Sequence, residues 1–260
     1  MSALAVGGNS EGGTVMASER NAARVAGFMF LFLIASVIAS SVLIGGVEGD
    51  EISETLRNAR DESFSVRLGV LFLIVGGIST LILAAALYAV TKHEDPDLAI
   101  LALSCRAVEA GLYAVGIIGA FVLLSLGERS ATASAGELTA AYTLGEIVSD
   151  VDAWGTNVGA AFFAVGSLLY SFLFLRARTI PVALSILGVI ASLILVVAVP
   201  LQTAGGQATT EGTWAVIWIP MIVFEISTGL WLIVRGAGAT IGTTPRAITA
   251  DGRSGGRQEP

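Results

Sequence analysis

Six long apolar stretches constrain the fold of this 260-residue chain more than any other feature of its sequence. A helix needs about 20 consecutive apolar residues to cross the roughly 30 Å hydrocarbon core of a bilayer. Their continuous apolar character favours helices over barrel strands, in which polarity alternates from residue to residue. The sequence therefore predicts an all-α polytopic membrane bundle of six transmembrane helices. The predicted spans are residues 25–46, 68–90, 98–126, 154–175, 180–201 and 214–234.

The composition supports this fold class and excludes several others. Hydrophobic residues make up 54% of the chain and charged residues 13%, whereas soluble domains average about 25% charged residues. A soluble enzyme, a disordered chain and a nucleic-acid binder are therefore excluded. One cysteine and one histidine exclude a site built from several such ligands. Because no nucleotide-binding or hydrolase motif is present either, we expect no enzymatic activity, cofactor or metal.

The segments outside the spans are expected to form two tails and five connections. Residues 1–19 and 237–260 are rich in small and polar residues, so both are expected to be disordered. Residues 20–236 then form one six-helix transmembrane domain, and Met1 and Met16 are both candidate start residues. Residues 47–65 are expected to hold a short helix with one apolar face. Residues 127–153 are expected to hold a helix that lies on the outer surface.

The distribution of charge predicts the orientation. With six spans, both termini lie on the same side, and that side carries nine of the 14 basic residues. Cytoplasmic loops carry an excess of Lys and Arg, so both termini are expected in the cytoplasm of a plasma-membrane protein. Twelve acidic residues fall on the outer side. We interpret them as a solvated surface; a vestibule that attracts cations is the alternative.

Three charged residues lie inside the spans: Arg106, Glu109 and Glu225. At 1.5 Å per residue they lie about 12–16 Å from the cytoplasmic ends of their helices. Because an isolated charge at this depth is costly, Arg106 is expected to bond Glu225, Glu109 or both, with the third and sixth spans as neighbours. Burial favours protonation of one of the two carboxylates. Secondary polar or helix-distorting candidates are Tyr88, Tyr113, Asn157 and Pro220.

Several short motifs give the chain a resemblance to a known family. They are Ala23–Gly27 and Val66–Gly69 at the starts of two spans, Cys105–Ala110, Ile180–Pro181, and Trp231–Gly236. In this order and spacing, residues 20–236 resemble the prokaryotic membrane family catalogued as domain of unknown function 4386. The resemblance implies a six-helix membrane protein without an assigned activity. It also directs attention to Arg67, which, like the three buried charges, falls on the family's pattern.

Two functions follow from these observations. The first is a non-enzymatic structural or accessory protein, in which the buried charges clamp the helices together. The alternative is a small-solute or proton-linked transporter that uses the layer of Arg106, Glu109 and Glu225. The lipid bilayer is the one expected partner and nucleic acid is excluded, whereas a protein partner or a homo-oligomer stays open.

Overall fold

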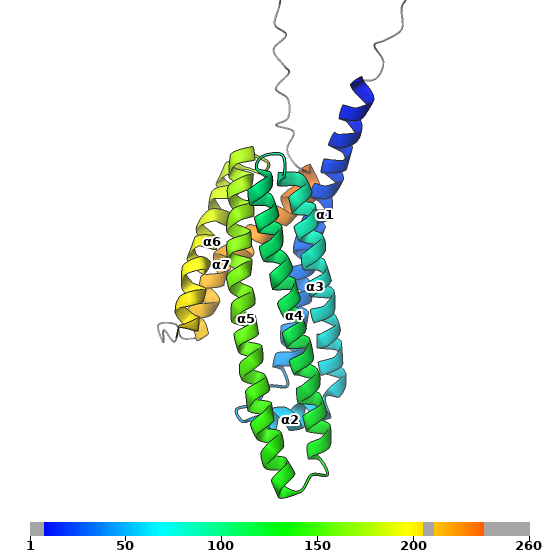
Figure 1. Cartoon of the computed structure of the whole chain (residues 1–260), viewed down its shortest axis with the longest axis vertical. Coiled ribbons are helices and arrows are strands. Elements are labelled where there is room, and N and C mark those ends of the chain that lie inside the picture. Colours follow the sequence, from blue (N-terminus) through cyan, green and yellow to red (C-terminus); the bar gives the residue numbers. More distant parts are fainter. Residues whose placement is uncertain (1–7, 205–210, 237–260) are drawn as a thin grey trace, which may run out of the picture.

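The computed structural model describes residues 8–204 and 211–236, and every regular element in these ranges is a helix. Six of the seven helices are long and apolar enough to cross a membrane, which confirms the predicted fold class (Figure 1). The long helices are α1 (Gly8–Gly45), α3 (Ser63–Thr91), α4 (Pro96–Ser130), α5 (Ala135–Ala177), α6 (Val182–Thr203) and α7 (Glu211–Arg235). The short helix α2 (Ile52–Asp61) lies between α1 and α3.

The six long helices form a closed ring. Following the contacts between neighbours, the order around the ring is α1, α3, α4, α5, α6, α7 and back to α1. Each of the six helices therefore presents one face to the interior of the ring. We call the side with the α3–α4 and α5–α6 turns the terminal side, because α1 enters the bundle and α7 leaves it there (Figure 1), and the opposite side the α2 side.

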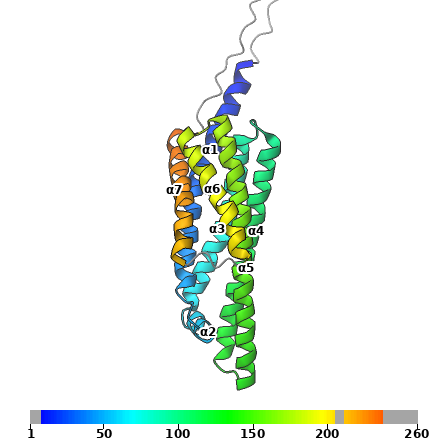
Figure 2. The ribbon, with the colours of Figure 1, turned by 90° about the vertical axis from the view of Figure 1, so that its left-hand side faces the viewer.

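The helices differ greatly in length, so the bundle has two tiers. Helix α5 has 43 residues and α6 has 22, which correspond to about 65 Å and 33 Å. Both helices meet at the terminal side, and α4 and α5 therefore extend far beyond α6 and α7 on the α2 side (Figures 1 and 2). The upper tier, in which all six helices are present, matches the thickness of a bilayer. The lower tier projects from it.

Residues 135–153 belong to this projection. They were expected to form a separate helix lying on the surface, but they are instead continuous with the membrane-spanning part of α5. The turn before them explains the start of the helix, because the Glu137 carboxylate accepts hydrogen bonds from the Ser134 backbone N–H and hydroxyl, both at 2.7 Å. A carboxylate in the first turn also interacts favourably with the helix dipole.

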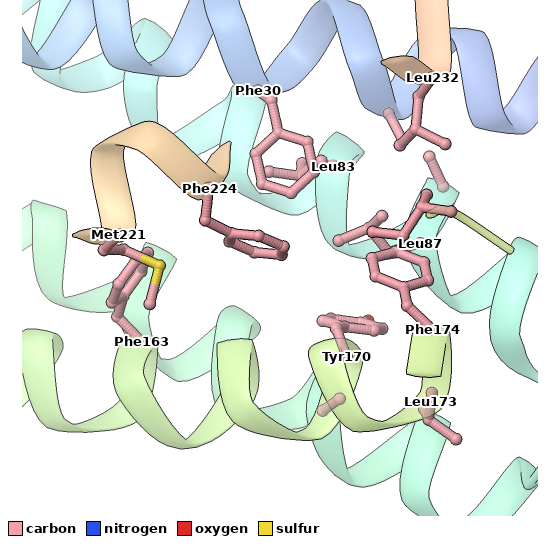
Figure 3. Close-up of a cluster of buried hydrophobic side chains, with 14 of the residues drawn as sticks. Phe30, Leu83, Leu87, Phe163, Tyr170, Leu173, Phe174, Met221, Phe224 and Leu232 are labelled. Carbon is pink, nitrogen blue, oxygen red and sulfur yellow. The ribbon is translucent and has the colours of Figure 1, made fainter. Parts of the chain in front are cut away.

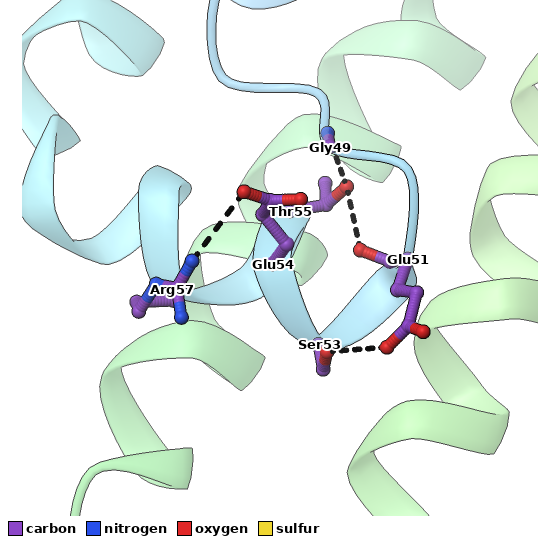
Figure 4. Close-up of polar contacts among 6 residues, drawn as sticks. All are labelled: Gly49, Glu51, Ser53, Glu54, Thr55 and Arg57. Atoms are coloured by element: carbon purple, nitrogen blue, oxygen red, sulfur yellow. Dashed lines mark hydrogen bonds and ion pairs between the residues drawn. The ribbon is translucent and has the colours of Figure 1, made fainter.

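Helix α2 packs sideways against the projecting ends of α4 and α5, as the apolar face of its sequence predicted. Leu56 and Ala59 are 0% and 3% exposed, and the backbone of Leu56 lies directly against Gly127 of α4. The start of the helix is held by polar contacts (Figure 4): the Gly49 N–H donates to Thr55 Oγ1 at 3.0 Å. The projection is therefore a packed unit of α2 with parts of α3, α4 and α5.

The terminal segments 1–19 and 237–260 were both expected to be disordered tails. Helix α1 begins at Gly8, within the segment 1–19 that was expected to be a disordered tail. Residues 1–7 and the expected tail at 237–260 lie outside the described residues. Helix α4 begins at Pro96, where the Asp95 side chain accepts a hydrogen bond from the Leu98 N–H at 3.1 Å.

The interior of the upper tier is filled with large apolar side chains. Five buried aromatic residues from α1, α5 and α7 belong to this core (Figure 3): Phe30, Phe163, Tyr170, Phe174 and Phe224. The Tyr170 hydroxyl also donates to the Ala84 carbonyl at 3.0 Å, which links α5 to α3 across the ring. Burial of such large side chains is a dominant contribution to core packing.

Candidate functional site: a buried charge cluster

The centre of the ring holds an ion pair between Arg106 and Glu109 of α4. The two residues are three positions apart on one helix face, and Arg106 Nη1 lies 3.0 Å from Glu109 Oε2. Arg106 is 1% exposed and Glu109 is 7% exposed. The predicted pairing of Arg106 with Glu109 is therefore confirmed, and it takes place away from lipid and from the bundle surface.

Helix α5 provides the surface on which the Arg106 side chain lies. The guanidinium carbon is 4.8 Å from the centre of the Phe163 ring, a distance typical of a cation–π interaction. Next to it, Gly166 leaves room for the aliphatic part of Arg106, because an added Cβ there would lie 3.2 Å from Arg106 Cδ. Arg106 thus packs between two helices and does not merely extend from one.

Glu225 of α7 completes the cluster. It is 8% exposed, and the charges of Arg106 and Glu109 both act on it. Its carboxylate forms no ion pair within 4.0 Å of Arg106 among residues 8–204 and 211–236. The expectation that the helices carrying Arg106 and Glu225 pack side by side is wrong, because α7 packs against α1 and α6. Glu225 is nevertheless buried and within electrostatic range of Arg106 and Glu109 on α4.

The polar atoms of this cluster have few hydrogen-bond partners. Glu109 Oε2, Glu225 Oε1 and all three guanidinium nitrogens are buried and make no hydrogen bond with a described residue. The contact between Arg106 and Glu109 is therefore close enough for an ion pair but not aligned as a hydrogen bond. A small cavity borders Arg106, Tyr170 and Phe224. Its volume of about 10 Å³ is roughly what one water molecule requires.

The secondary candidates lie at several levels of the bundle, and one of them belongs to the cluster. Tyr113 of α4 faces Gly76 and Gly77 of α3, and it is within electrostatic reach of the three charged residues. Tyr88 is partly buried against the apolar core, and Asn157 is partly buried on α5, nine residues or about 13 Å from Gly166.

Arg67 and Pro220 have different surroundings. Arg67 forms an ion pair with Glu128 at 3.3 Å, and both side chains are more than half exposed in the projecting tier. Such exposed pairs contribute little to stability. Pro220 lies within α7, five residues before Glu225. Neither residue therefore adds a group to the buried cluster.

The residues that surround Arg106 on α5 were not identified from the sequence. Phe163, Gly166 and Tyr170 are unremarkable in a long apolar stretch that contains several aromatic residues and glycines. Their spacing of three and four places them on one helix face, but only the contact with α4 shows that this face receives a charge. Within the described residues, no group of three His, Cys, Asp or Glu side chains is arranged to hold a metal ion.

Comparison with known proteins gives one match. A family model described as "Domain of unknown function (DUF4386)" matches residues 25–236, which include α1 from residue 25, the other five long helices and all three charged residues of the cluster. No curated protein and no solved structure matches the chain significantly.

Proposed function

The chain belongs to the domain of unknown function 4386 family, and we propose that it is a non-enzymatic structural or accessory protein of the membrane. The observation that carries this proposal is the position of Arg106 of α4, which is paired with Glu109 of the same helix, lies over the Phe163 ring of α5 and acts on Glu225 of α7. Removing a charge from such a buried set leaves its partner uncompensated. The cluster therefore acts as a clamp that joins three helices of the ring.

The small size of the cavity at Arg106 supports the clamp. About 10 Å³ accommodates one water molecule and excludes any organic solute. Large buried aromatic side chains, Phe30, Tyr170, Phe174 and Phe224, line this cavity (Figure 3). A tightly filled interior favours a packing role for the charges over a role in solute passage.

The clamp is tested by unfolding the purified protein in detergent. Arg106→Gln is expected to lower the free energy of unfolding by about 3–5 kcal/mol, because it leaves buried carboxylates without their cation. Arg129→Gln on the exposed end of the same helix is the matched control and should change it by less than about 0.5 kcal/mol. Equal effects of the two substitutions would contradict the clamp.

A proton-linked transporter is the second candidate, and the unpartnered polar atoms of Arg106 and Glu225 favour it. Intramembrane ionisable groups commonly mark proton or solute pathways. Flux of protons and small solutes into proteoliposomes separates the two functions. A structural protein gives the same flux as empty liposomes, whereas a transporter gives flux that Glu225→Gln abolishes.

We infer further that the protein lies in the plasma membrane with both termini in the cytoplasm, because most basic residues flank the terminal side. In a Cys105→Ala background, single cysteines are placed at Thr132 in the α4–α5 turn and at His93 in the α3–α4 turn. A membrane-impermeant maleimide should label the first cysteine in intact cells and the second only after permeabilisation. The reverse pattern would contradict this orientation.

A further inference from the structure

The buried cluster contains more carboxylates than cations. Arg106 supplies one positive charge, and Glu109 and Glu225 supply two carboxylates, each less than one-tenth exposed. Two ionised carboxylates would leave one negative charge uncompensated within the ring, where an unpaired ion is costly. The two helices that pack against α7 supply no cation, because α1 from residue 25 and α6 contain no titratable side chain.

The geometry distinguishes the two carboxylates. Glu109 lies 3.0 Å from the guanidinium and is the ion-pair partner of Arg106. Glu225 has no ion pair with a described residue, and its Oε1 is buried without a hydrogen bond. The other titratable groups that act on the cluster are the phenols of Tyr113 on α4 and Tyr170 on α5, which carry no charge that would balance a carboxylate at neutral pH.

We propose that the cluster is a proton-binding site, in which Glu109 balances Arg106 and Glu225 carries one exchangeable proton. In the protonated state the cluster is neutral, with one cation, one carboxylate and one carboxylic acid. Release breaks the Glu225 O–H bond, leaves the electron pair on the carboxylate and transfers the proton to water. This site does not depend on the clamp or on transport, since either function is compatible with a bound proton.

Infrared spectroscopy of the full chain in lipid nanodiscs at neutral pH tests the proposal. A protonated carboxylic acid has a C=O stretching band that is separate from the carboxylate bands and shifts in D₂O. The wild-type protein should show the band of one buried acid, and Glu225→Gln should remove it. Glu109→Gln should remove it as well, because Glu225 then becomes the carboxylate that balances Arg106.

Substitution of the cation gives the opposite result. Arg106→Met should double the band, because neither carboxylate then has a cation to balance it. Glu146 is an exposed carboxylate on α5, so Glu146→Gln is the control and should leave the band unchanged. If Arg106→Met does not fold, the wild type and the two glutamate variants decide the outcome by themselves.

Three results would overturn the proposal. The first is the absence of the band from the wild-type protein, which would mean that both carboxylates are ionised. The second is a band that persists in Glu225→Gln, which would place the proton on another residue. The third is a band that persists in Glu109→Gln, which would show that Arg106 does not determine the protonation of Glu225. None of these results bears on the unfolding or flux measurements, so the two proposals fail separately.

Discussion

At the scale of single residues, the close contact between the backbones of α1 and α7 depends on Gly27. A Cβ added there would lie 2.6 Å from the Gly229 carbonyl oxygen and 2.8 Å from the Ile233 nitrogen of α7. Gly27→Ala should therefore force α1 and α7 apart and lower the free energy of unfolding by about 1–3 kcal/mol. Thermal unfolding in detergent measures this change.

Gly111 provides the matched control for this substitution. It lies on an exposed face of α4, and an added Cβ would meet nothing within 4 Å. Gly111→Ala should leave stability unchanged or raise it by up to about 1 kcal/mol, because alanine is the better helix former. If Gly27→Ala behaves like Gly111→Ala, the contact between α1 and α7 is not as close as the structure shows.

A second residue-scale prediction concerns Asp61 at the end of α2. The Arg60 Nε–H donates to the Asp61 carboxylate at 2.8 Å, which lowers the pKa of Asp61 below its ordinary value. The interaction is present at pH values above the ordinary carboxyl pKa and is lost as pH falls through the lowered pKa. NMR titration should show the low pKa in the wild type and a return toward the ordinary value in Arg60→Gln. An unchanged titration in Arg60→Gln would contradict the assignment.

At the scale of elements, α2 is held in place mainly by Leu56. This side chain is 0% exposed and packs where α2 meets α4. Leu56→Ala should destabilise the docked helix by about 2–5 kcal/mol, so that amide hydrogen exchange of residues 52–61 becomes faster. The control is Arg57→Ala, whose side chain is 59% exposed and whose ion pair with Glu54 should contribute less than about 1 kcal/mol.

The range of residues whose hydrogen exchange changes in Leu56→Ala shows how much of the projection depends on α2. If Leu56→Ala accelerates exchange in α2 alone, the helix is a locally stable unit docked on the projection. Acceleration throughout residues 120–150 would instead show that α2 stabilises the whole projecting tier. No acceleration in either region would contradict the packing of Leu56.

At the scale of the whole molecule, the two tiers should lie in different environments. Leu144 and Phe172 are both exposed on α5, at 52% and 41%, but they are 28 residues or about 42 Å apart. A spin label at Leu144 should be relaxed by a water-soluble paramagnetic reagent and one at Phe172 by oxygen, which concentrates in lipid. Equal accessibility of the two labels to both reagents would contradict a projection outside the bilayer.

The sequence predicts some of this organisation and misses the rest for physical reasons. Hydropathy reports how favourably a segment partitions into a bilayer, so it located the six spans. It did not indicate that α5 continues back to Ala135, because that part of the helix contains several polar and acidic residues. Spacing along one helix identified the pair of Arg106 and Glu109. The order of helices around the ring depends on contacts such as Gly27 against Gly229, and nothing distinguishes these two among 31 glycines.

The uninterrupted helix α5 connects the interior of the ring directly to the projection. Because the same 43-residue helix contacts Arg106 inside the ring and Ile52 of α2 in the projection, a change of tilt within the bilayer moves the far end. About 20 residues, or 30 Å, lie beyond the upper tier. A tilt of about 10° at the bilayer surface would displace the tip by roughly 5 Å. A rearrangement around the buried cluster that tilted α5 would therefore also displace the part of the molecule that lies beyond the bilayer.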